Sequence, residues 1–381
     1  MQTKGTIINF HGQNVYAGID VHLNSWKVTI MLENVVHKTF SQDPCAKTLA
    51  DYLKKNFPGA DYFSAYESGF CGFSVHRELI KHGINNIIVN PADIPTKDKD
   101  KKQKEDKRDS RKIAKSLKNG DLEGIFILST KMEELRGLVR YRKTIVKEIG
   151  RNKNRIKSYL YLNGIDIPSE LSSASKYWSG KFTQWIKTIE MSTIYGKMVL
   201  QETVETVEYL RLKLLKINRE LKNIFKNSEY SKQLEVIQSI PGFGLIMAIT
   251  LLSELEEFSR FTNLDKLCSY VGLVPTTDSS GDNEKTGPIT SRSNKSLRSS
   301  IIESAWVAVR IDPSLAYSYN DLCKRMKPNE AIIRIAKKLL SRLRYLIKNE
   351  TEYSYSLKNI VNIGNKNTSK LGNCCPALAA N

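Results

Sequence analysis

The stretch KEDKRDSRKIA, residues 104–114, places two aspartates, Asp106 and Asp109, within a run of lysines and arginines. It predicts the start of a helix that continues to about Lys118. Side chains three residues apart share one helical face and lie about 5–6 Å from each other, so both carboxylates can reach one cation. A paired acid in a basic segment suits a divalent metal ion that acts on a polyanion. The alternative is a solvated helix start whose acids favour the positive end of the helix dipole.

The composition of the whole chain indicates a polyanionic partner. Its 381 residues include 59 Lys and Arg against 40 Asp and Glu, which gives a formal net charge of +19. An excess of this size is typical of proteins that bind nucleic acid, although a ribosome-like or membrane-surface role also produces it. Because no apolar run reaches roughly 18 residues, we expect no membrane span.

The positions of the cysteines and histidines argue against a disulfide framework and, beyond His82, against a zinc site or a histidine base. The six cysteines show neither a CxxC pair nor a regular framework, which favours reduced thiols in a cytoplasmic protein. All five histidines lie at or before His82, so the rest of the chain has no imidazole for a zinc site or a histidine base. The polar N-terminus lacks the apolar segment of a signal peptide.

The first predicted domain, residues 1–128, combines strands with helices, which is typical of an α/β domain with a mixed sheet. Apolar runs predict strands at residues 15–20, 26–32, 35–40, 62–66 and 84–89, with one more at 125–128. Helices are expected at residues 44–56, 73–82 and 106–118. A charged run at 96–104 is expected to form a loop before the last helix.

The remaining segments are predicted to be all-α. In residues 129–229, two long helices at 131–157 and 197–227 carry apolar residues in steps of three and four, as in a coiled coil. A helix buried in its own domain fits that pattern equally well. Between these helices, residues 165–195 are expected to be irregular.

A third domain is expected at residues 230–350, followed by a disordered polar tail at 351–381. Its predicted elements are helices at 245–256, 297–310 and 329–348 and a Gly- and Ser-rich loop at 273–296. The turn IPGFG at 240–244 is similar to a helix-hairpin-helix element, in which backbone amides can hold a DNA phosphate.

Two further acids, Asp20 and Glu67, lie at strand ends in the first domain. An acid at the end of a buried strand is costly unless it is paired or binds a metal. With Asp106 and Asp109, they can form a site for two Mg²⁺ or Mn²⁺ ions about 3.5–4 Å apart, which stabilise the attacking and leaving oxygens of a phosphodiester. The sequence therefore predicts metal-dependent phosphoryl transfer. A non-catalytic nucleic-acid-binding protein, whose acids only balance charge, is the alternative.

The residues around these acids resemble a known family. The segments GIDVH at 18–22, YESG at 66–69, NP at 90–91 and 104–114 are similar to the DEDD domain of one class of bacterial insertion-sequence transposases. That domain is related to the RuvC Holliday-junction resolvase and has a ribonuclease H-like fold. The third predicted domain resembles the C-terminal domain of the same family, through IPGxG at 240–244, YVGLVP at 270–275, SG at 280–281 and GxIT at 287–290. Piv-type DNA invertases share both domains.

This resemblance implies a DNA recombinase that uses Mg²⁺ and a serine nucleophile. Asp20, Glu67, Asp106 and Asp109 would hold the metal, and Ser280, with Ser279 as the alternative, would attack the DNA phosphate. A junction-resolving nuclease that uses activated water is the competing enzyme. In the segment after the serines the family often has Lys-x-Gly, whereas this chain has SRS at 291–293.

The resemblance also implies the partners. These are the DNA of the element ends and of the target, a structured guide RNA, and further copies of the chain in a homodimer or homotetramer. A bacterial protein associated with the nucleoid is also implied. The residues expected to contact nucleic acid are Arg108, Arg111, Arg140, Arg151, Gly242, Gly244, Arg292, Lys295 and Arg298.

Overall fold

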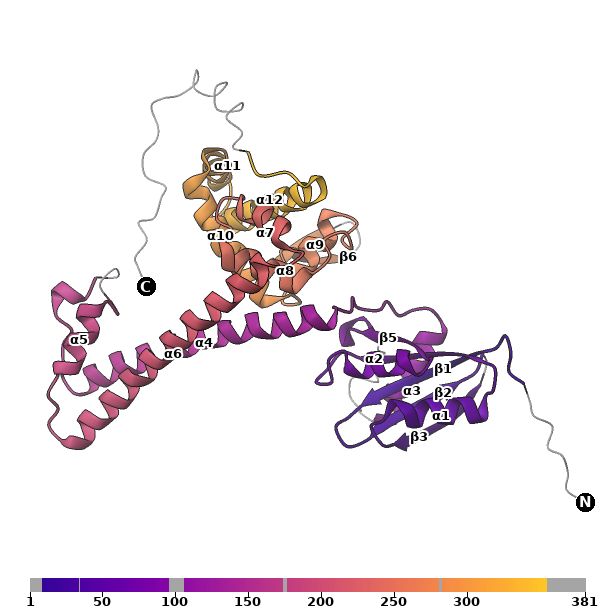
Figure 1. The fold of residues 1–381 in the computed structure, drawn as a ribbon. Helices are drawn as coiled ribbons and strands as arrows, with labels where there is room; N and C mark the ends of the chain where they lie inside the picture. The colour runs from indigo at the N-terminus through magenta and orange to yellow at the C-terminus, as the bar shows by residue number, and fades with distance from the viewer. Residues whose placement is uncertain (1–8, 34, 96–105, 174–176, 281–282, 355–381) are drawn as a thin grey trace, which may run out of the picture. The chain divides into compact units, whose positions relative to one another are not determined.

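The computed structural model describes residues 9–33, 35–95, 106–173, 177–280 and 283–354 (Figure 1). At residues 106–107, 277–280 and 283–286 it describes the backbone alone. The chain divides into two compact units, Met1–Ile127 and Leu128–Asn381. The predicted loop at 96–104 lies outside the described residues.

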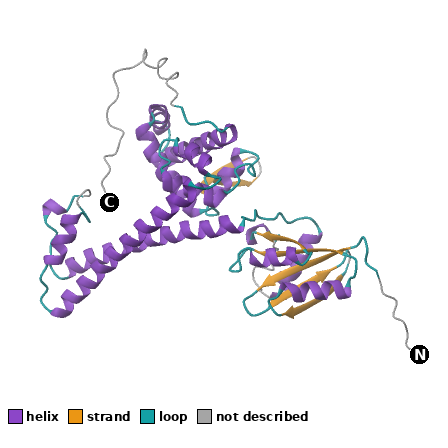
Figure 2. Cartoon of the chain, in the orientation of Figure 1, coloured by secondary structure: helices purple, strands orange, loops and turns teal. Residues whose placement is uncertain are grey.

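The first unit is built on a mixed five-stranded sheet (Figure 2). Across the sheet the strands lie in the order β3 (Val36–Gln42), β2 (Trp26–Met31), β1 (Asn14–Val21), β4 (Asp61–Glu67) and β5 (Asn85–Val89). The first three are antiparallel neighbours, whereas β4 is parallel to β1 and β5 is parallel to β4. This arrangement confirms the predicted mixed sheet and is consistent with a ribonuclease H-like domain.

The strand predicted at 125–128 is wrong. Gly124 forms only an isolated bridge with Val89, and Ile125 donates one hydrogen bond of 2.7 Å to the Ile88 carbonyl. The chain leaves the sheet edge after this contact, so no ladder forms.

Three helices cover the two faces of the sheet. They are α1 (Ala46–Asn56), α2 (Ser74–Lys81) and α3 (Asp106–Lys118), with a short 3-10 turn η1 (Pro91–Asp93) after β5. Ile113 of α3 packs against Ala65 and Val89, which fixes α3 to one face. Asn86 bonds His76 of α2 and Ser64, the residue before Ala65. Because side chains alternate along a strand, α2 lies on the opposite face.

Two long helices, α4 (Thr130–Leu162) and α6 (Ile194–Lys226), pack side by side in the second unit (Figure 1). Ile156 near the end of α4 clusters with Leu200 near the start of α6, whereas Val139 shares a cluster with Phe225. The helices are therefore antiparallel.

The segment between α4 and α6 is more regular than predicted. It contains a 3-10 turn η3 (Ser169–Leu171) and α5 (Gly180–Thr188). Phe182 and Ile186 are buried against the end of the α4–α6 pair, and tertiary packing of this kind stabilises a helix too short to persist alone.

In the described residues after α6, six helices pack around one apolar core. They are α7 (Ser231–Gln238), α8 (Leu245–Leu255), α9 (Leu264–Val271), α10 (Lys295–Ile311), α11 (Pro313–Cys323) and α12 (Pro328–Asn349). No helix in the described part of the chain combines the length and apolar character that a membrane crossing needs.

The predicted loop at 273–296 is wrong, because it contains an antiparallel hairpin of β6 (Pro275–Ser280) and β7 (Asn283–Ile289). Gly287 allows the strands to approach, since a Cβ there would lie 2.4 Å from Thr276 Oγ1. Its serines and glycines resemble loop composition, whereas Thr276, Thr277 and Thr286 are β-branched residues that favour strand.

The chain beyond α12 is anchored at Tyr353, which lies within the tail predicted to be disordered. Its hydroxyl donates to the buried carboxylate of Asp312, and its backbone N–H donates to Ser239 Oγ at 2.8 Å. Residues 355–381 of that tail lie outside the described residues.

Candidate functional site

Asp20 and Glu67 lie at the carboxyl ends of two adjacent parallel strands. The β1–β4 register pairs Gly18 with Ala65 and Ile19 with Tyr66, so the two acids follow the last of these pairs. Side chains two residues apart project from the same face of a sheet. Asp20 therefore shares the face of Gly18, and Glu67 shares the face of Ala65. This is the face that α3 covers.

Position 18 must be glycine for α3 to lie where it does. A Cβ at Gly18 would be 2.1 Å from the Ser110 carbonyl oxygen and 2.3 Å from the Ala114 nitrogen, both on α3. A buried hydrogen bond of 2.9 Å joins the hydroxyls of Thr29 and Ser110. These contacts hold α3, which begins at Asp106, on the face of the sheet that carries Asp20 and Glu67.

Two of the candidate acids contact basic side chains of the same chain. Asp20, 22% exposed, lies 3.1 Å from His22 Nε2, and Asp109, 26% exposed, accepts a hydrogen bond of 3.3 Å from Lys112. Among the side chains that the structure describes, no group of three or more His, Cys, Asp or Glu could hold a metal ion. The side chain of Asp106 lies outside that description. As a donor set, carboxylates alone fit Mg²⁺, which prefers oxygen ligands.

The two candidate serines lie at the end of a strand. Ser279 pairs with Glu284 in the β6–β7 register, and Ser280 pairs with Asn283 beside the hairpin turn. Their side chains lie outside the description. The base of the hairpin is held by Arg298, which donates hydrogen bonds to the carbonyls of Thr290, at 2.6 Å, and Gly272, at 3.3 Å. Ser280 is thus carried by a hairpin with a fixed base.

Three residues expected to contact nucleic acid have internal contacts. Arg298 holds the hairpin, and Arg140 forms two hydrogen bonds of 2.8 Å with Glu254, whose side chain is 1% exposed. Gly242 has a φ of +83°, and a Cβ there would lie 2.2 Å from the Ser304 carbonyl oxygen. This glycine is therefore needed for close packing against α10.

Five of the remaining six residues expected to contact nucleic acid are exposed. Arg151 forms an ion pair with Glu148 but remains largely exposed, and Gly244 precedes α8 at an exposed position. Arg111, Arg292 and Lys295 are exposed, and Arg108 is half-buried. Their contacts with nucleic acid stay predictions.

A basic pocket between α4, α8 and α10 was not predicted. It has a volume of about 430 Å³, and its lining includes Arg142, Lys143 and Lys147 of α4 with Ser296 of α10. The sequence signal was the excess of Lys and Arg over residues 131–157. That excess indicated a charged helix without showing which side chains face a pocket.

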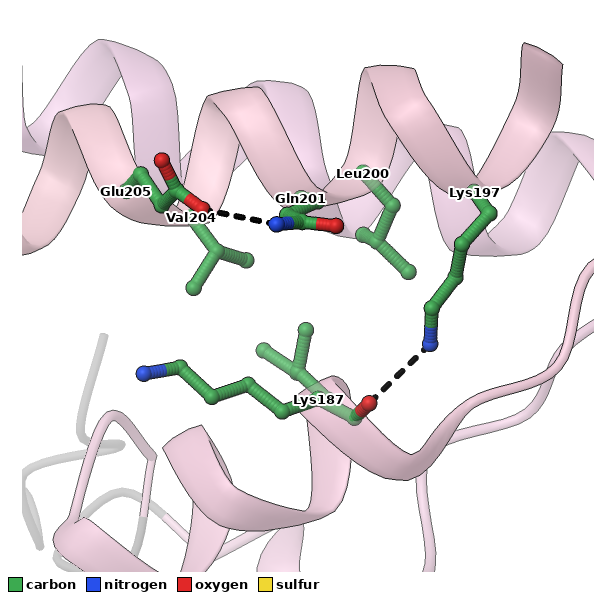
Figure 3. Close-up of a pocket in the computed structure, with 7 residues that line it drawn as sticks. Lys187, Lys197, Leu200, Gln201, Val204 and Glu205 are labelled. Carbon is green, nitrogen blue, oxygen red and sulfur yellow. Dashed lines mark hydrogen bonds between the residues drawn. The ribbon is translucent and has the colours of Figure 1, made fainter. Parts of the chain in front are cut away.

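A second pocket, of about 340 Å³, lies between α5 and α6 (Figure 3). Lys197 donates hydrogen bonds to the carbonyls of Lys187, at 3.0 Å, and Ile189, at 2.6 Å. Gln201 donates to Glu205 at 2.9 Å beside it. Because Lys197 satisfies the last carbonyls of α5, we interpret this pocket as structural.

Comparison with known proteins gives two matching family models. The model described as the transposase IS116/IS110/IS902 family matches residues 234–320, which include α8 and the serine hairpin. A second, described as a transposase and of the DEDD type of IS110, matches residues 17–163, which include all four candidate acids. Together the two segments cover more than half of the chain.

Individual relatives carry similar names. The putative transposase y4qE of Sinorhizobium fredii is 26% identical over 245 residues, 64% of this chain and 58% of that protein. The transposase for insertion sequence element IS1533 of Leptospira borgpetersenii is 24% identical over 66% of this chain and 72% of its own length. The putative transposase y4rJ of S. fredii is 26% identical over 86% of this chain and 90% of its own.

Proposed function

We propose that this chain, which belongs to the IS116/IS110/IS902 family of transposases, cuts and rejoins DNA to move an insertion sequence. The observation that carries this proposal is the common face of Asp20, Glu67 and α3, which the close contact at Gly18 maintains. The net charge of +19 supports a polyanionic substrate. We further propose that the protein lies in the cytoplasm and associates with the nucleoid.

The metal would be held by Asp20, Glu67, Asp106 and Asp109. A pair of Mg²⁺ ions, or Mn²⁺ in their place, supplies Lewis-acid stabilisation of charge on the scissile phosphate when bound. Strand ends and the first turns of a helix would supply the four carboxylates, and the close packing of α3 on the sheet supports this arrangement. Lys112, which pairs with Asp109, offers a further cation beside the substrate.

Ser280 would be the nucleophile, with Ser279 as the alternative. Its Oγ forms a bond to the phosphorus and loses its proton, while the bond from phosphorus to one DNA oxygen breaks and that oxygen takes up a proton. The resulting phosphoserine conserves the energy of the diester, so a DNA hydroxyl can attack it and restore both the diester and the serine. Its place beside the turn of a hairpin with a fixed base supports this role.

A structured guide RNA and an oligomer complete the proposal. The α4–α6 pair would form a coiled coil that joins the protomers of a homodimer or homotetramer. On α6 the large apolar side chains of Met198, Tyr209, Leu212 and Leu215 are more than half exposed, which supports a partner on that helix. The turn at 240–244 would contribute a helix-hairpin-helix-like contact with DNA.

The test is to incubate the purified protein with element-end DNA, RNA transcribed from the flanking segment and Mg²⁺, and to look for a phosphoserine adduct. We expect Ser280→Ala to abolish the adduct and Ser279→Ala to retain it. The reverse pattern would make Ser279 the nucleophile. DNA cleavage that survives both substitutions without an adduct would favour the junction-resolving nuclease.

Asp106→Asn tests the metal site in the same assay. We expect it to remove DNA processing at every Mg²⁺ concentration, because one of four carboxylate ligands is lost. If processing and its Mg²⁺ dependence were unchanged, the acids would only balance charge, as in a non-catalytic nucleic-acid-binding protein.

A further inference from the structure

The basic pocket between α4, α8 and α10 carries more positive charge than its own carboxylates balance. Arg140 at its edge is neutralised by Glu254. This leaves Arg142, Lys143 and Lys147 facing one further carboxylate, that of Glu303, which lies on the exposed side of α10. The pocket is therefore electrostatically suited to an anion.

Lys143 is the lysine on which this arrangement acts most clearly. Burial lowers the pKa of Lys143, and the charge of Lys147 lowers it further, although Glu303 and Glu254 act in the opposite direction. Lys143 donates hydrogen bonds to Ser296, at 2.9 Å to the hydroxyl and 3.3 Å to the carbonyl. A bound anion would favour the charged form of this lysine and relieve its repulsion from Lys147.

Neutral hydrogen-bond donors also line the pocket. The hydroxyl of Ser296 lies in the first turn of α10, and Ile246 belongs to the first turn of α8, whereas the Ser300 hydroxyl donates to the Ser296 carbonyl at 3.1 Å. Gly244 precedes α8 and provides no side-chain acceptor for the first amides of that helix. Cations, hydroxyls and helix amides are together the groups that hold phosphate oxygens.

The basic surface continues along α4 beyond the pocket. Another, more open hollow, of about 520 Å³, lies along α4 and is lined by Arg151, Asn154, Arg155 and Ser158. From Lys143 to Ser158 the helix rises about 22 Å at 1.5 Å per residue, which is longer than any single phosphate group. This length suits a chain of phosphates rather than a mononucleotide.

We propose that the pocket and the adjoining face of α4 bind the phosphodiester backbone of a nucleic acid, with Lys143 and Lys147 as the central phosphate contacts. The inference rests on the proposed function in that nucleic acid is the expected partner. DNA and RNA share this phosphodiester chemistry, and separate binding measurements distinguish them.

The test is fluorescence anisotropy with the full chain in EDTA, which prevents cleavage. Labelled duplex DNA of mixed sequence and labelled single-stranded RNA are titrated separately over a range of salt concentrations. For Lys147→Gln we expect roughly fivefold weaker binding of at least one of the two nucleic acids at about 0.15 M salt. The nucleic acid whose binding weakens is the one that the pocket holds. The salt slope should fall by about 0.9 for duplex DNA or about 0.7 for a single strand.

Two comparison variants separate pocket binding from a general loss of charge. Glu303→Gln removes the remaining carboxylate of the pocket, so we expect tighter binding, an effect that a merely structural role of the pocket would not produce. Lys324→Gln removes one exposed cation directly after α11, outside the pocket, and should change affinity by less than roughly twofold, with an unchanged salt slope.

The inference is overturned if Lys143→Gln and Lys147→Gln bind both nucleic acids as Lys324→Gln does. Far-UV circular dichroism and thermal unfolding establish that each variant is folded. A wild-type chain that binds nucleic acid through these lysines in EDTA but forms no adduct with Mg²⁺ contradicts the proposed transposase reaction and leaves the pocket assignment intact.

Discussion

Gly18→Ala is expected to displace α3 from the sheet. The new methyl group would meet the Ser110 carbonyl oxygen at 2.1 Å and the Ala114 nitrogen at 2.3 Å. Both are backbone atoms, so no side-chain rotation can relieve the clash, and the helix itself must move. The substitution therefore disturbs the element that carries Asp106 and Asp109, although it removes no functional group.

The magnitude follows from two opposing terms. Overpacking of a core costs about 1–3 kcal/mol. Because the new methyl group meets backbone atoms at such short distances, we take a cost of about 3 kcal/mol. Replacing glycine within a strand returns about 0.5–1 kcal/mol of conformational entropy. The net destabilisation is about 2 kcal/mol, which raises the equilibrium constant for local opening by roughly 30-fold.

Hydrogen–deuterium exchange of the full chain measures this opening at α3 and β1. We expect amide exchange to accelerate by roughly 30-fold in both elements. Gly69→Ala is the matched control, because a Cβ there would meet only the Glu67 carbonyl oxygen, at 3.9 Å. Exchange in Gly18→Ala that equals that of Gly69→Ala would refute the argument that this glycine positions α3.

Two further substitutions test the second unit. Glu254→Gln should destabilise it by about 2–3 kcal/mol in urea unfolding, because the charge-assisted bonds to Arg140 and Asn294 are weakened in a buried site; unchanged stability would exclude a structural role for the pair. Burial would raise the pKa of Asp312, but hydrogen bonds from Tyr353 and its other donors outweigh it and lower the pKa. The resulting stabilisation is present above the unfolded pKa of about 3.9 and is lost as pH falls through the lower folded value. Asp312→Asn should therefore remove this loss from unfolding curves at low pH, and an unchanged pH profile would contradict it.

The elements predicted correctly share a strong local signal. Strands β1, β2, β4 and β5 are apolar and bounded by turn residues, α12 has clear helical periodicity, and α8 is an apolar run that follows a Pro-Gly turn. Helices α7, α9 and α11 were not predicted, since each is short and stabilised mainly by contacts with distant helices.

The places of Asp20 and Glu67 at strand ends were predictable, because each follows an apolar strand pattern, whereas their common edge of the sheet follows from the parallel pairing of β1 with β4. The roles of Arg140 and Arg298 were not. Arg140 finds Glu254 at a separation of 114 residues, and a long-range partner of this kind leaves no local pattern. A count of basic residues predicts the presence of a charged surface but does not separate arginines with internal partners from those that face solvent.

The hairpin changes what can be expected of Ser280. A serine in a long flexible loop would lose conformational entropy whenever it met a phosphate, at about 1–2 kcal/mol for each residue ordered. On β6 the backbone of Ser280 is already ordered by its register with Asn283, and Arg298 fixes the hairpin base. Motion that brings the proposed nucleophile to the DNA would therefore involve the hairpin as a whole. Residues at its base, such as Gly272 and Arg298, would then influence the rate of adduct formation without contacting the phosphate.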